Sequence, residues 1–103
     1  MFTEQDFSKR LCELRMAKGI SARKMSIDIG QNVSYINSIE NGHGLPSMAT
    51  FFYICDYFGI EPKEFFDEEL QNPQATKELA DELKNLNDEQ IELVRTLIKQ
   101  FKK

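Results

Sequence analysis

Apolar residues recur every three or four positions along most of the chain, which is the spacing of an amphipathic helix rather than of a strand. A first helix is predicted over residues 4–18, with Thr3 as its N-cap and Gly19 as its left-handed C-terminal cap. Its buried stripe is expected to consist of Phe7, Leu11 and Leu14. The pattern then changes to shorter segments, each closed by a glycine.

A second helix of about two turns is predicted to begin after Ser21, whose hydroxyl can cap it, and to end at Gly30. A third helix follows within three residues, with Asn32 as its expected N-cap and Gly42 after its end. Ile36 and Ile39 form its apolar stripe. At about 100 degrees per residue, the opposite side carries only small groups: Ser34, Asn37, Ser38 and Asn41, with Val33 at the helix start.

A fourth helix is predicted over residues 48–58, closed by Gly59, and Pro62 is well placed to begin a short fifth one. Phe65 and Phe66 are expected to return to the core from this fifth helix. The expected core side of the fourth helix is Met48, Phe51, Ile54, Cys55 and Phe58. The pattern therefore predicts five helices within a unit that spans residues 1–70.

An acidic, polar segment with Pro73 predicts a boundary near residue 70, followed by a C-terminal helical hairpin over residues 71–103. The last helix has an apolar arc of about 160 degrees, wider than the roughly 100 degrees that one neighbouring surface needs. We expect this unit to make a homodimer, with an interface that includes Leu93, Leu97 and Phe101. The alternative is that the last helix packs only against its own chain.

A helix, a tight turn and a second helix over residues 21–42 form a helix-turn-helix arrangement, with Ser26 as the small residue where the helices cross. The segments GISARKMSIDIGQNVSYINSIENG and LPSMATFFYICDYFGIEPKEFF resemble the lambda-repressor/Cro-type helix-turn-helix family. The resemblance covers about residues 5–67. The matching positions are Tyr35, Ile36, Ile39, Glu40, Gly42, Pro46, Phe58 and Gly59.

This resemblance implies an all-α, five-helix DNA-binding domain whose third helix lies in the major groove of double-stranded DNA. It implies base contacts from Val33, Ser34, Asn37 and Ser38, and phosphate contacts from Ser21 and Asn41. It also implies a structural ion pair between Arg15 and Glu40 beneath the third helix. The chain departs from the family at Ala22, where glutamine is common, and in having no arginine on the reading face for guanine. Modest affinity and guanine-poor sites are therefore expected.

Charge is unevenly distributed along a chain whose formal net charge is −4. One acid, Glu13, accompanies the basic residues of segment 9–24, which are Lys9, Arg10, Arg15, Lys18, Arg23 and Lys24. Arg23 and Lys24 lie in the predicted first turn of the second helix, where the macrodipole disfavours cations, so DNA phosphates are their expected partners. His43 adds a further candidate phosphate contact. The alternative is an ordinary solvated basic surface.

Catalytic and metal-binding patterns are lacking, because His43 is the only histidine and the two cysteines, Cys12 and Cys55, are far apart. We therefore expect no enzyme activity and no cofactor. No long apolar run or leader pattern occurs, so a cytoplasmic protein without a membrane partner is expected. The leading hypothesis is a sequence-specific transcriptional regulator, a repressor that binds its operator as a homodimer. The alternative is a protein-interaction module of antitoxin or anti-repressor type that uses Phe52, Tyr53 and Tyr57.

Overall fold

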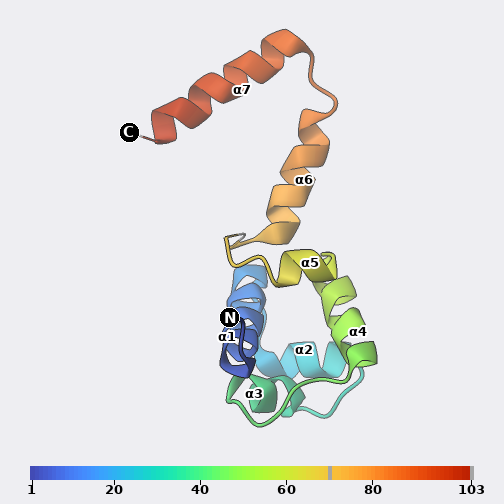
Figure 1. Cartoon of the computed structure of the whole chain (residues 1–103). Helices are drawn as coiled ribbons and strands as arrows, with labels where there is room; N and C mark the ends of the chain where they lie inside the picture. The colour runs from blue at the N-terminus through green and yellow to red at the C-terminus, as the bar shows by residue number, and fades with distance from the viewer. Residues whose placement is uncertain (70, 103) are drawn as a thin grey trace.

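The computed structural model describes residues 1–69 and 71–102, and over this part of the chain it contains seven helices and no strand. Figure 1 shows the helices up to residue 65 gathered into a bundle, from which the C-terminal helices project. The all-α fold class is thereby confirmed. The helices are α1 (Glu4–Lys18), α2 (Ala22–Asp28), α3 (Tyr35–Glu40), α4 (Met48–Phe58), α5 (Pro62–Phe65), α6 (Pro73–Leu83) and α7 (Asp88–Phe101).

The ends of the bundle helices follow from local chemistry that the sequence already displays. The side chains of Thr3, Ser21 and Ser47 accept hydrogen bonds from backbone N–H groups in the first turns of α1, α2 and α4. Gly19 and Gly59 close α1 and α4 in the left-handed conformation, at φ 76° and 69°. The predicted N-caps of α1 and α2 and the predicted glycine ends of α1 and α4 are therefore confirmed.

The predicted start of the third helix is wrong by two residues. Asn32 is not the N-cap, because its side-chain oxygen accepts hydrogen bonds from the Ser34 N–H at 3.1 Å and the Ser34 hydroxyl at 2.9 Å. This local turn competes with the helix, as short polar side chains commonly do. Regular helix begins at Tyr35, with Ser34 in the N-cap position, so Val33 and Ser34 precede α3.

The core fills the space enclosed by α1 to α5 and is rich in aromatic rings. Phe7 and Phe65 have their ring centroids 4.8 Å apart, and Phe51 meets Phe65 edge-on at 5.1 Å. Two expected core residues are corrected: Met48 and Phe66 are 66% and 45% exposed. The buried apolar set is Phe7, Leu11, Leu14, Met25, Ile36, Ile39, Phe51, Ile54, Cys55, Phe58, Ile60 and Phe65.

The two C-terminal helices extend away from the bundle. Pro73 is fully buried, and Gln74 lies against Gly59, so the first turn of α6 is anchored on the bundle. Beyond it α6 and α7 open as an angle rather than lying side by side, and α7 has no buried residue (Figure 1). The molecule is 50 Å long with a radius of gyration of 16.6 Å. A compact chain of this length would have a radius of gyration of about 13 Å.

Candidate nucleic-acid interface

The outer side of the helix-turn-helix presents the four residues predicted to contact bases. Val33 is 44% exposed in the turn before α3, and Ser34 beside it is exposed. Asn37 is exposed on α3, whereas Ser38 is half-buried. Ile36 and Ile39 occupy the opposite side of α3 and are buried. The surface is therefore small, polar and backed by a fixed apolar core, as expected of a helix that approaches another molecule closely.

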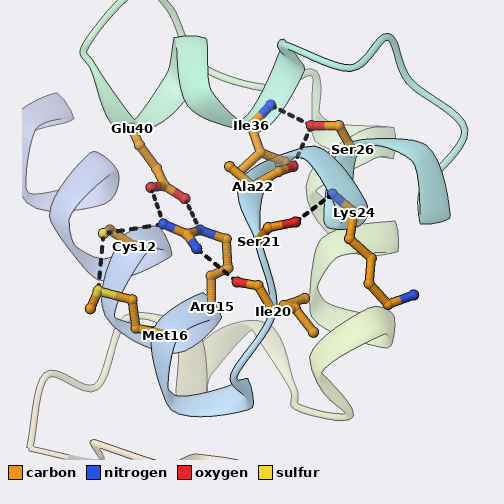
Figure 2. A network of polar contacts seen from close by, with 10 residues as sticks. All are labelled: Cys12, Arg15, Met16, Ile20, Ser21, Ala22, Lys24, Ser26, Ile36 and Glu40. Carbon is orange, nitrogen blue, oxygen red and sulfur yellow. Dashed lines mark hydrogen bonds and ion pairs between the residues drawn. The ribbon is translucent and has the colours of Figure 1, made fainter.

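Ser26 ties the beginning of α3 to α2. Its hydroxyl donates to the Ala22 carbonyl at 2.8 Å and accepts the Ile36 N–H at 3.0 Å (Figure 2). The Ile36 N–H belongs to the first turn of α3, where backbone donors have no partner within the helix. Ser26 is fully buried, so this bond replaces water that cannot reach the group. The small residue expected at the helix crossing also fixes how α3 sits on α2.

Arg15 and Glu40 form a bidentate ion pair between α1 and the last turn of α3 (Figure 2). The two contacts measure 2.7 and 2.9 Å, and the side chains are 16% and 9% exposed. Arg15 also donates to the Ile20 carbonyl at 2.7 Å. The hydrogen bond to Glu40 raises the pKa of the Arg15 guanidinium above its ordinary value. This pair holds the end of α3 on the bundle and leaves neither group available for DNA.

A third attachment of α3 has no counterpart in the sequence interpretation. The Ser8 hydroxyl donates to the Ile39 carbonyl at 2.7 Å, and Ser8 is buried. Its position directly after Phe7 and three residues before Leu11 places it at the edge of the buried stripe of α1. That position was a signal that its hydroxyl would need a partner. Ser8, Arg15 and Ser26 together hold both ends of α3.

The basic segment contributes less surface charge than its composition indicates. Arg10 is 1% exposed and donates to the carbonyls of Glu64 and Phe65 at the end of α5. Burial lowers the pKa of its guanidinium. Arg15 is paired as described. Counting Arg10 as part of a basic surface is therefore wrong, because it stabilises the bundle from within, whereas Arg15 forms the ion pair predicted for it.

The remaining predicted phosphate contacts lie around the same end of the molecule. Lys24 lies 3.1 Å from Asp28, so an acid of its own helix is available to its charge, and its contact with a DNA phosphate stays a prediction. Arg23 is exposed in the first turn of α2, and within residues 1–69 and 71–102 no acid lies within ion-pair distance of it. Ser21, Asn41 and His43 are exposed. Their roles stay predictions.

Other kinds of site find little support in the described residues. No group of three or more potential metal ligands occurs among them. None of the described helices combines the length and apolar character needed to cross a bilayer. An apolar groove of about 550 Å³ does lie away from α3, between the start of α1 and the start of α4. It is lined by Phe2, Phe7, Leu45, Met48, Phe52 and Phe66, among others.

Comparison with known proteins gives one match. The model of the family described as helix-turn-helix matches residues 13–65, which is just over half of the chain and includes α2, the turn and α3. No curated protein and no solved structure matched the chain. The family match covers the same helices that carry the exposed polar surface and its three attachments. The chain therefore belongs to the helix-turn-helix family of lambda-repressor/Cro type, and it is a DNA-binding transcription regulator of that type.

Proposed function

We propose that this regulator reads a specific operator through α3 and the turn before it, and that it acts as a repressor by occupying that operator as a homodimer. The observation that carries this proposal is the small, mostly polar surface that Val33 and Ser34 form with Asn37 and Ser38, on a helix fixed at both ends and the turn before it. A fixed helix can present its side chains in one geometry, which base recognition requires.

The chemistry of this surface favours A·T-rich positions. An asparagine amide can both donate to and accept from the major-groove edge of adenine, and an apolar side chain such as Val33 can contact a thymine methyl. Serine hydroxyls can serve either as donors or as acceptors. No arginine or lysine lies among the four residues, so the bidentate contact that usually reads guanine is lacking there.

Selection from random DNA duplexes tests sequence-specific reading. The full chain is expected to enrich a defined site, and Asn37→Ala is expected to weaken binding to that site by about 1 to 3 kcal/mol while relaxing preference at one base position. Asn85→Ala is a matched control, because Asn85 is exposed in the connection between α6 and α7. Failure of the folded protein to enrich any sequence would contradict the proposal.

The homodimer is proposed to form through α7. Four of its apolar residues, Leu93, Leu97, Ile98 and Phe101, are exposed, and none of its residues is buried by the described part of the chain. Leu93, Leu97 and Phe101 follow one another at intervals of four, which aligns them along one face. A two-fold partner would cover this face and present two copies of α3 to half-sites about 34 Å apart.

A second candidate function is protein binding, as in an antitoxin or anti-repressor partner. It is favoured by the apolar groove and by the exposure of Phe52 and Tyr53 on α4. Tyr57 is less suited to such a role, because it is half-buried and donates its hydroxyl to Asp28. The selection experiment separates the two functions, since a module used only for protein binding would enrich no DNA sequence.

A further inference from the structure

One carboxylate oxygen of Asp28 accepts hydrogen bonds from two side chains. The Tyr57 hydroxyl of α4 donates to Oδ2 at 2.7 Å, and the Lys24 ammonium of α2 lies 3.1 Å from the same atom. Lys18 lies over the Tyr57 ring, with its nitrogen 5.2 Å from the ring centroid. Three helices, α1, α2 and α4, therefore meet in one surface network built around Asp28.

The ion pair between Lys24 and Asp28 is placed unfavourably for the stability of α2 itself. Lys24 is in the first turn of α2 and Asp28 is its last residue, so each charge lies at the helix end where the macrodipole disfavours it. A basic residue four positions before an acidic one is also the weaker orientation of a helical ion pair. The arrangement is therefore explained better by what it does to Lys24 than by what it does for the helix.

The contact with Asp28 determines where the Lys24 ammonium lies. Its side chain extends away from α3, and its ammonium is held on the α4 side of the molecule (Figure 2). The hydrogen bond from Tyr57, followed by that from Lys24, lowers the pKa of Asp28, so the carboxylate is charged at neutral pH. Tyr57 fixes the acid from a neighbouring helix, and the acid in turn competes with any DNA phosphate for the lysine.

We propose that Asp28, positioned by Tyr57, withholds Lys24 from DNA phosphates and thereby limits sequence-independent binding. This inference rests on the proposed function, because it assumes that the side of the domain carrying α2 and α3 faces DNA. A phosphate contact strengthens binding to every sequence alike, whereas base contacts discriminate between sequences. Restraining one lysine therefore lowers the affinity for random DNA and for the operator by the same factor, without any contact between Asp28 and a base.

The test measures binding of the full chain to its selected site and to a random duplex over a range of salt concentrations. Asp28→Asn is expected to raise random-duplex affinity about fivefold and to steepen the dependence of log affinity on log salt by about 0.9, the value of one added phosphate contact. Tyr57→Phe is expected to act in the same direction more weakly. Adding Lys24→Met to Asp28→Asn is expected to remove the gain.

Asp56→Asn is the matched control, because it changes the net charge equally at an exposed position of α4 outside the network. Equal gains from Asp28→Asn and Asp56→Asn would overturn the inference in favour of a general charge effect, and so would no gain from Asp28→Asn. A melting curve for each variant verifies folding, and Tyr57→Phe keeps the test decisive if Asp28→Asn does not fold. Failure of the proposed function would appear separately, as a wild-type protein without any preferred site.

Discussion

Arg15 and Glu40 are mostly buried and satisfy one another, so losing one partner is expected to cost more than losing both. Arg15→Met or Glu40→Met is expected to lower the free energy of unfolding by about 3 kcal/mol, because each strands a charge. The double variant is expected to recover much of that loss. Denaturant unfolding of the four proteins measures this coupling, and small, additive losses would show that the pair is effectively solvated.

Tyr57 gives a pH-dependent prediction. Burial, followed by the hydrogen bond to Asp28, raises the pKa of Tyr57 to about 12 from its ordinary value of 10.0. A raised pKa means that this contribution to stability is complete below pH 10 and is lost as the pH rises through about 12. Phenolate absorbance should show a late titration step near pH 12, and Tyr57→Phe should abolish that step. A late step that persists in Tyr57→Phe would contradict this assignment.

Several single-residue environments could not be predicted from the sequence because they depend on contacts distant along the chain. Arg10 looked like part of a basic segment, yet its guanidinium lies against the carbonyls of Glu64 and Phe65, more than fifty residues away. Lys24 has a local partner, but only the fold brings Tyr57 to the same carboxylate. Exposure of Asn37, by contrast, followed directly from helical spacing.

At the scale of elements, α3 is expected to lose its fixed position when its attachment to α2 is removed. Ser26→Ala leaves the buried Ile36 N–H without its acceptor, which is expected to cost about 1 to 3 kcal/mol of stability. Ser34→Ala is a suitable comparison, because its hydroxyl contacts only the exposed turn at Asn32. Unfolding midpoints would measure the difference, and equal stability of the two variants would contradict a structural role for Ser26.

Element boundaries were predictable where one local signal dominated. Thr3, Gly19, Ser47 and Gly59 each have a single favourable role, and the structure uses them in those roles. Asn32 was ambiguous, because an asparagine can cap a helix or close a local turn. In the structure it forms the local turn with Ser34. The resulting shift places two proposed base-contacting residues before α3 rather than within it.

At the scale of the whole molecule, the uncovered face of α7 predicts self-association. Leu97→Glu is expected to convert a dimer into a monomer at tens of micromolar, an order-of-magnitude concentration typical of ordinary protein affinities. Thr96→Glu adds the same charge on the polar side of α7 and is expected to leave the dimer intact. Sedimentation or light scattering measures both. A monomeric wild-type chain at that concentration would remove this interpretation.

The C-terminal helical hairpin predicted from the sequence differs from the structure, in which α6 and α7 open as an angle (Figure 1), and the difference has a physical reason. An apolar face indicates that a helix needs a partner, but not whether that partner is the same chain or another one. The boundary near residue 70 likewise stays a prediction, although burial of Pro73 shows that the first turn of α6 packs on the bundle. The five-helix unit was easier to predict, because α1, α2 and α4 have side-chain N-caps and glycines close α1 and α4.

The most direct measurement of the central claim is an NMR titration of the labelled full chain with the selected duplex. We expect the largest changes in backbone amide shifts to fall on residues 33–41 and the first turn of α2, and Asn37→Ala to reduce them. Asn85→Ala is expected to leave them unchanged. Changes confined to the apolar groove or to α7, with residues 33–41 unaffected, would contradict recognition through α3.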